Sequence, residues 1–182
     1  MAETKRSGPA AHEAAPLPTT DTAQDTDRCD TLTGVAHAAE AAVLGAMLLD
    51  DDARHGVPSM LDPDSFDREA HRTVYGAVLA VLEDGDTPDP LTVTAKLAER
   101  GRLDEVGGPV AVSDLSSMDV CPVPASWPAY ATVVAREARR RRGIVTLRVA
   151  LDRLERGEDP EVVAWGLRGK VARSGLCGEV GR

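Results

Sequence analysis

The sequence contains three Asp-Pro pairs, and these constrain its fold more than any other feature: Asp62-Pro63, Asp89-Pro90 and Asp159-Pro160. An aspartate side chain accepts hydrogen bonds from the free N–H groups in the first turn of a helix. A proline at the first helical position forfeits no helical hydrogen bond. Each pair therefore predicts the start of a helix, and this capping role explains the three aspartates without any catalytic function.

Apolar side chains recur at the spacing of a helix face ahead of the first pair and after each start. The first face ends at the acidic run Asp50–Asp52, the second at Asp84-Gly85, and the third at Gly101, which is suited to the left-handed closing position. Pro58 limits any helix between the first two faces, and Pro109 starts a further short helix. The apolar positions are Val43, Leu44, Met47 and Leu48; Phe66, Ala70, Val74, Val78, Val81 and Leu82; Leu91, Thr94, Leu97 and Ala98; Val112 and Leu115.

The longest helical pattern begins after Pro128 and reaches Gly157, and Asp159-Pro160 then starts a last helix. Two helices joined by a short loop that contains glycine form a helical hairpin. The apolar positions of these two helices are Tyr130, Val133, Val134, Ala138, Ile144, Leu147, Leu151 and Leu154, followed by Val163, Leu167 and Val171.

These patterns predict an all-α protein with a compact multi-helix globule over residues 34–120 and a C-terminal helical hairpin over residues 121–173. A content of one Phe, two Trp and two Tyr in 182 residues also favours close-packed helices over aromatic-rich sheets. Residues 1–33 are rich in Ala, Pro, Thr and Asp and show no apolar period, so we expect a disordered tail. The Gly-rich residues 174–182 are expected to form a flexible tail.

The net charge of −9 argues against a protein whose main task is to neutralise a nucleic-acid backbone. The odd number of cysteines, Cys29, Cys121 and Cys177, without a C-x-x-C spacing, indicates a reducing compartment, and we expect a cytoplasmic protein. No apolar run approaches the roughly 20 residues that cross a bilayer, so no membrane association is expected.

Residues that could suggest chemistry have simpler interpretations. His71 could act as a general base, but no partner is placed beside it in the sequence, which favours a packed or hydrogen-bonded histidine. His12, His37 and His55 share no metal-ligand spacing with one another or with the cysteines. The Asp50–Asp52 run lacks the loop of a calcium site and is interpreted as a solvated helix end. We predict no catalytic residue, no metal and no cofactor.

Five local patterns over residues 37–173 resemble the amino-terminal, non-ATPase domain of bacterial replicative DnaB-type helicases, in the same order and at similar distances. They are Glu40-x-x-Val43-Leu44-Gly45-Ala46-Met47-Leu48-Leu49-Asp50, Phe66-x-x-x-Ala70-His71-Arg72-x-Val74-Tyr75, Asp89-x-Leu91-Thr92-Val93, Leu97-x-x-x-Gly101-x-Leu103-x-Glu105-Val106-Gly107-Gly108, and Tyr130-Ala131-x-Val133-Val134-x-Arg136-Glu137-x-x-Arg140.

The resemblance implies a helical domain whose hairpins pair between subunits to build dimers and a ring-shaped collar. It also implies partners among primase, helicase loaders and the helicase itself, and close approach of a neighbouring helix at Gly45. The 182 residues contain no G-x-x-x-x-G-K-[ST] loop for nucleotide phosphates, so we expect no ATPase or helicase activity from them.

The segment from Arg136 to Arg142 contains five arginines and one glutamate. Consecutive residues point around all sides of a helix, so the segment reads as an interface with a solvated face, a contact for an acidic partner, or a nucleic-acid contact, in that order. Arg141 lies near the apolar face and could meet a carboxylate on a partner hairpin. An exposed Trp127 or Trp165 would favour an interface, and packing in the core is the alternative for each of them. The interface candidates are Trp127, Tyr130, Val134, Arg136, Arg140, Arg141, Ile144, Leu147, Leu151 and Trp165.

The leading hypothesis is a non-catalytic interaction and oligomerisation module related to DNA replication. It would associate with itself, as a dimer or higher ring, and with helicase, primase or loader. One alternative is a nucleic-acid-binding accessory protein that uses the arginines at 136–142. Another is a truncated helicase fragment without a function.

Overall fold

The computed structural model describes the backbone of residues 22–173 and the side chains of residues 33–168, and every regular element in that part of the chain is helical. The predicted all-α fold is therefore confirmed. Residues 1–21 and 174–182, most of the two predicted tails, lie outside the described residues. The helices are α1 Thr22–Leu49, α2 Asp51–Met60, α3 Glu69–Glu83, α4 Pro90–Glu99, α5 Gly108–Asp114, α6 Trp127–Glu155 and α7 Pro160–Arg173, with 3-10 turns η1 Pro63–Ser65, η2 Asp104–Val106 and η3 Pro124–Ser126.

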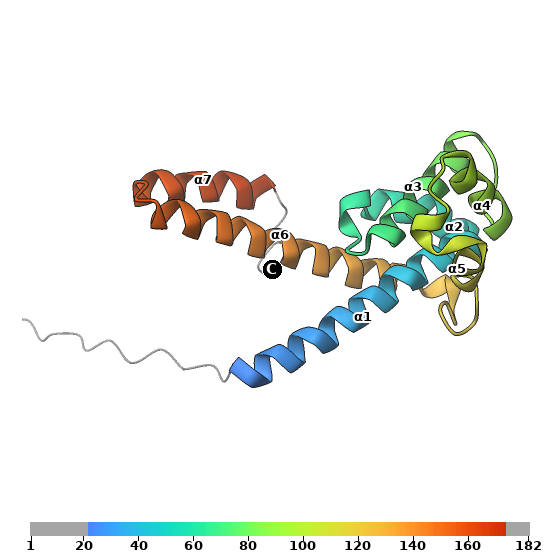
Figure 1. Ribbon diagram of the computed structural model, residues 1–182, viewed down its shortest axis with the longest axis horizontal. Coiled ribbons are helices and arrows are strands. Elements are labelled where there is room, and N and C mark those ends of the chain that lie inside the picture. The colour runs from blue at the N-terminus through green and yellow to red at the C-terminus, as the bar shows by residue number, and fades with distance from the viewer. Residues whose placement is uncertain (1–21, 174–182) are drawn as a thin grey trace, which may run out of the picture.

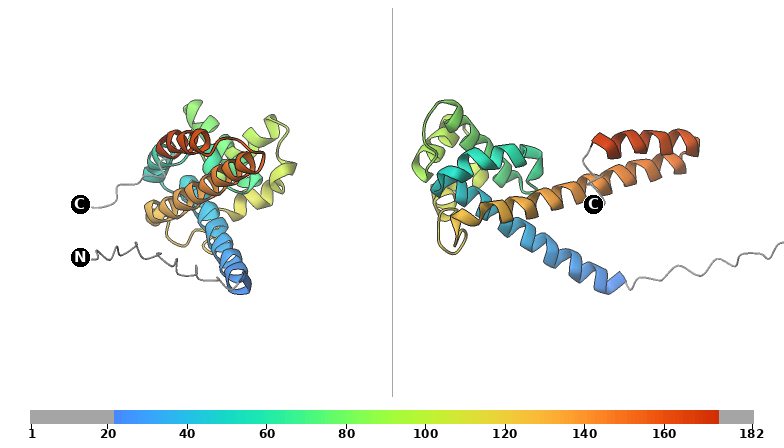
Figure 2. Two further views of the ribbon diagram at one scale, coloured as in Figure 1. Left: turned by 90° about the vertical axis from the view of Figure 1, so that its left-hand side faces the viewer. Right: turned by 180° about the vertical axis from the view of Figure 1, so that it is seen from behind.

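The helices divide into a globule and a projecting hairpin (Figure 1). In the globule, the C-terminal part of α1 packs against α2, α3 and the first part of α6, α2 also contacts α6, and α4 packs on α3 and α5. From there α1 and α6 leave the globule on the same side and diverge, and α7 folds back along the far half of α6 (Figures 1 and 2). Half of α6 therefore belongs to the globule and half to the hairpin.

The core of the globule is built from the predicted apolar faces. The side chains of Val43, Leu44 and Met47 in α1 are fully buried, and Phe66 and Tyr75 pack with their ring centroids 4.7 Å apart. The Tyr75 hydroxyl donates a hydrogen bond of 2.9 Å to the carbonyl of Leu61, which satisfies its polar end inside the core. Of the four predicted positions in the third face, Leu97 is buried and Thr94 is partly exposed, whereas Leu91, at 78%, and Ala98 are exposed.

Helix α2 contains Pro58 and ends two residues after it, at Met60, so the proline limits this helix as expected but does not prevent it. The carboxylate of Asp50 caps it by accepting a 2.9 Å hydrogen bond from the N–H of Ala53. Ala53 and Val57 are fully buried, and Arg54 donates hydrogen bonds of 3.0 Å to the carbonyls of Met47 and Leu48 at the end of α1. This cap, the burial and the bonds to α1 offset the one helical hydrogen bond that proline removes.

The helix expected to run from Asp62 to Asp84 is interrupted. Asp62 caps only the short η1, through reciprocal hydrogen bonds with Ser65, and the backbone is extended at Phe66 and Arg68 before α3 begins at Glu69. The interruption leaves the N–H groups of Asp67 and Arg68 free of helical bonds.

Two further expectations concern Gly45 and the start of α1. A Cβ atom added at Gly45 would lie 2.1 Å from the carbonyl oxygen of Leu115, so the chain after α5 approaches α1 closely there, as the resemblance implied. Helix α1 begins at Thr22, inside the segment 1–33 that was expected to be a tail, and not near His37.

Candidate interaction surface

Local sequence signals build the hairpin. Gly157 adopts a left-handed φ of 84° just after α6, and its N–H bonds to the carbonyl of Leu154. Asp159 then caps α7 by accepting a 2.7 Å hydrogen bond from the N–H of Glu161. Arg153 and Glu158 form an ion pair across the turn, which lowers the pKa of the Glu158 carboxyl. The predicted hairpin and the capping role of Asp159 are thus present in the structure.

The two hairpin helices pack through small side chains. Ala150 of α6 and Val163 of α7 are 7% and 2% exposed, and Gly166 presents no side chain to Arg153 opposite. Val149 and Leu167 also line this seam, while several larger apolar side chains of both helices remain exposed. Leu147, Leu151 and Leu154 stand at successive helical turns of α6, which puts them on one face, and we call these three residues the leucine stripe.

The leucine stripe is exposed in the single chain. Leu147 is 62% exposed, Leu151 57% and Leu154 41%, and Trp165 of α7 is 80% exposed. Val145, Val149 and Val162 add further exposed apolar area on the same two helices. The leucine stripe is a run of neighbouring exposed apolar side chains on one helix face, and such a run marks a site of interaction, because leaving it in water forgoes the free energy of burial.

The structure separates the ten predicted interface residues into three groups. Leu147, Leu151 and Trp165 are exposed, and Ile144 is partly exposed. Val134 is 1% exposed in the core, Tyr130 packs against the core, and Trp127 packs on Gly56, where an added Cβ would lie 2.1 Å from the indole ring. These last three residues pack α6 against the globule, with Val134 buried and Trp127 and Tyr130 partly exposed.

The predicted arginines form the third group. Arg141 donates a 2.7 Å hydrogen bond to the carbonyl of Ser65 and lies 3.3 Å from the Asp67 carboxylate, so it meets an acid of its own chain. Arg140 pairs at 2.6 Å with the buried Glu137. Arg136 is 63% exposed, with its Nε 3.7 Å from Glu137. Arg142 pairs with Asp62 at 2.8 Å.

The burial of the Glu40 carboxylate was not predicted from the sequence. Glu40 is 1% exposed on the apolar face of α1 and accepts hydrogen bonds from the N–H of Asp67 at 2.6 Å and of Arg68 at 3.4 Å. The oxygen that accepts from Arg68, Oε2, also contacts His71 Nδ1 at 2.9 Å, so the expectation of a hydrogen-bonded His71 is confirmed. The signal was present in the sequence, since Glu40 occupies a helical position between Ala36 and Leu44, which are both buried.

Asp67 extends this polar cluster to the hairpin. A 2.8 Å hydrogen bond from His37 and the nearby Arg141 guanidinium lower the pKa of the Asp67 carboxyl. One carboxylate thus joins α1 to α6 through its two partners. The cluster fixes helices in place and lies apart from the exposed hairpin surface.

No arrangement suited to catalysis stands out in the described residues. Burial raises the pKa of the Cys121 thiol, which disfavours the nucleophilic thiolate. Across residues 33–168 no three His, Cys, Asp or Glu side chains gather where they could hold a metal ion. Within the same part of the chain, none of the helices has the length and apolar character needed to cross a bilayer.

Comparison with known proteins relates the globule and the start of α6 to replicative helicases. A family model described as the DnaB-like helicase N terminal domain matches residues 35–136. The replicative DNA helicase DnaB of Geobacillus stearothermophilus is 37% identical over 126 residues, which make up 69% of this chain and 27% of that protein. The DnaB of Mycobacterium leprae is 41% identical over 105 residues, 58% of this chain and 17% of that protein. The chain therefore spans only about a quarter, or less, of the length of these relatives.

Solved structures agree with the sequence matches. The crystal structure of the N-terminal domain of DnaB helicase from Mycobacterium tuberculosis has a TM-score of 0.69 at 33% identity, covering 74% of this chain and 95% of that one. A DnaB-like replicative helicase, solved in a study of its interactions with primase, has a TM-score of 0.62 and covers 79% of this chain and 32% of its own. At 19% identity, this second likeness concerns the fold alone.

Proposed function

Because this chain belongs to the family of DnaB-like helicase N-terminal domains, we propose that it is a non-catalytic interaction module of DNA replication that associates with itself through its hairpin. The observation that carries this proposal is the exposed leucine stripe together with Trp165. Fully burying one leucine side chain contributes roughly 1.5–3 kcal/mol, so pairing two hairpins would recover a substantial free energy. A second copy supplies the same apolar face and therefore a matching surface.

Partners other than a second copy are proposed from the family. A solved structural neighbour concerns a DnaB-like helicase and its interactions with primase, and we extend that class of partner, with helicase and loader, to this chain. Direct binding of nucleic acid has less support, because Arg140, Arg141 and Arg142 are engaged by carboxylates of the same chain and the net charge is −9.

Sedimentation velocity tests the self-association. We expect the wild-type chain to form a dimer or a larger closed oligomer, and the double substitution Leu147→Asp with Leu151→Asp to give a monomer. Leu91→Asp is the matched control, since Leu91 is 78% exposed on α4, outside the hairpin, and its substitution should leave the oligomer intact. A wild-type chain that remains monomeric at every concentration would overturn the proposal, as would loss of the oligomer in the control alone.

A further inference from the structure

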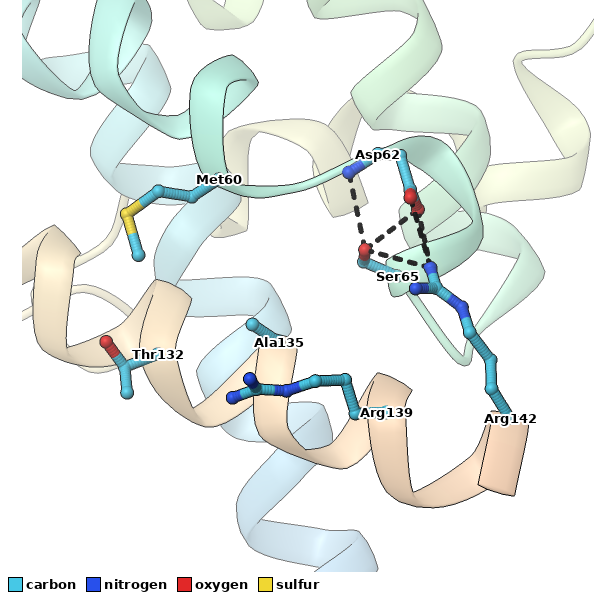
Figure 3. A pocket seen from close by; sticks show the side chains of 7 residues that line it. All are labelled: Met60, Asp62, Ser65, Thr132, Ala135, Arg139 and Arg142. Carbon is cyan, nitrogen blue, oxygen red and sulfur yellow. Dashed lines mark hydrogen bonds and ion pairs between the residues drawn. The ribbon is translucent and has the colours of Figure 1, made fainter. Parts of the chain in front are cut away.

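A pocket of about 340 Å³ lies between α6 and the segment that joins α2 to α3 (Figure 3). Helix α6 contributes Thr132, Ala135, Arg139 and Arg142, and Met60 and Asp62 line the opposite side. This volume lies at the lower end of the range for ligand pockets, so it suits one or two side chains of a partner. The pocket is separate from the leucine stripe, because it sits on the half of α6 that packs on the globule.

The two arginines of the pocket differ in their partners. The Nη2 atom of Arg142 lies 2.8 Å and 3.1 Å from the two carboxylate oxygens of Asp62. Arg139 extends along the pocket between Thr132 and Arg142 in Figure 3, and no described side chain or carbonyl forms a hydrogen bond or ion pair with it. Two guanidinium groups and one carboxylate leave the pocket with one uncompensated positive charge, located at Arg139.

The charge and shape of the pocket indicate the chemistry of its ligand. A guanidinium presents parallel N–H groups that match the two oxygens of a carboxylate. A singly charged group balances the single surplus charge, whereas a phosphate dianion would exceed it and would be repelled about twice as strongly by Asp62 at the same distance. Met60, which is 43% exposed, and Ala135 offer apolar surface to the carbon chain that carries the carboxylate.

We infer that this pocket binds a glutamate or aspartate side chain of a partner protein, with Arg139 as the residue that holds the carboxylate. The inference rests on the proposed function in that it assigns one docking point to a protein partner. It does not require self-association, because all the lining residues belong to one chain. The bound carboxylate would be held on α6, at the base of the hairpin, opposite the segment after α2.

The test uses the full 182-residue chain labelled with ¹⁵N and the short probe acetyl-Leu-Glu-amide, which carries one carboxylate. We expect a saturable shift of the Arg139 Nε–H signal with this probe and none with acetyl-Leu-Gln-amide. Arg139→Gln should raise the Kd, followed on the backbone amides of Thr132 and Ala135, by about ten-fold, since it removes a charge-assisted bidentate contact. Arg148→Gln is the matched control, because Arg148 is an exposed arginine on the hairpin half of α6, outside the pocket.

Three results would overturn the inference. The first is an equal response to the Glu and Gln probes, and the second is equal weakening by Arg139→Gln and Arg148→Gln, which would indicate a general charge effect. The third is tighter binding of inorganic phosphate or of a single-stranded oligothymidylate at Arg139, which would make the pocket a phosphate site. Failure of the proposed function would look different: the chain would sediment as a monomer while the probe still shifted Arg139.

Discussion

At the scale of single residues, Glu40 shows how one buried charge can organise distant parts of the chain. Its carboxylate lies on the apolar face of α1 and takes hydrogen bonds from Asp67, Arg68 and His71, which are about thirty residues away in sequence. A buried carboxylate without donors would cost several kcal/mol, so the extended backbone before α3 and the burial of Glu40 depend on each other.

We predict that Glu40→Gln lowers the free energy of unfolding by roughly 2 kcal/mol, because it weakens hydrogen bonds to a charged acceptor and directs an amide N–H at existing donors. Urea unfolding followed by circular dichroism measures the change. Glu83→Gln is the control, since Glu83 is exposed at the end of α3, and it should alter stability by less than about 0.5 kcal/mol. Equal effects of the two substitutions would contradict the role assigned to Glu40.

Residue roles that depend on local sequence were predictable, and those that depend on distant contacts were not. Each of the three capping aspartates lies within a few residues of the turn or helix that it caps, so the local sequence is enough to predict the cap. They are Asp62, Asp89 and Asp159. Arg141 meets a carbonyl 76 positions earlier in the chain, and no local window reveals that distance. The sequence therefore suggested a carboxylate on a partner hairpin and did not reveal the contacts of Arg141 within the same chain.

At the scale of helices, the position of α1 depends on a glycine. A Cβ atom at Gly45 would lie 2.1 Å from the backbone oxygen of Leu115 and 2.8 Å from Cβ of Cys121, and neither atom can move without shifting the chain after α5. We predict that Gly45→Ala lowers the free energy of unfolding by about 1–3 kcal/mol, the usual cost of overpacking. Thermal and urea unfolding would measure it.

Gly76→Ala provides the comparison. Gly76 lies within α3, and nothing stands within 4 Å of the Cβ atom it would gain. Alanine has the higher helix propensity, so this substitution should leave stability unchanged or raise it by up to about 1 kcal/mol. If Gly45→Ala proved as harmless as Gly76→Ala, the close approach of α1 and the chain after α5 would not constrain the fold.

Helix α2 shows how tertiary contacts support an element that its local sequence only weakly predicts. The rule that proline limits a helix is correct about the hydrogen bond lost at Pro58. It omits the contacts that α2 makes with α1, through buried Ala53 and Val57 and through the Arg54 hydrogen bonds. Tertiary contacts outweighed local propensity there, whereas in the hairpin the glycine and the aspartate cap agreed with the final structure.

At the scale of the whole molecule, α6 changes its surroundings along its length. Val134 and Leu147 are both apolar residues of one helical pattern, yet the first is buried in the globule and the second is 62% exposed on the hairpin. Periodicity shows which apolar residues share a helix face but not which neighbouring element that face meets. The sequence therefore predicted the hairpin, but its list of interface residues combined buried residues of the globule with exposed residues of the hairpin.

Association through the exposed half of α6 should couple folding to protein concentration. An oligomer that forms only from folded chains is stabilised by mass action, so for a dimer each ten-fold increase in concentration should raise the apparent free energy of unfolding by about 1.4 kcal/mol per mole of dimer. Urea unfolding of the wild-type chain over a series of concentrations measures this slope.

In the Leu147→Asp, Leu151→Asp variant the slope should vanish. Its stability should match that of the wild-type chain at low concentration, because the two leucines contribute little burial to the single chain. A variant that unfolds more easily even at the lowest concentration would show instead that the leucine stripe stabilises the hairpin itself and leaves its pairing unsupported.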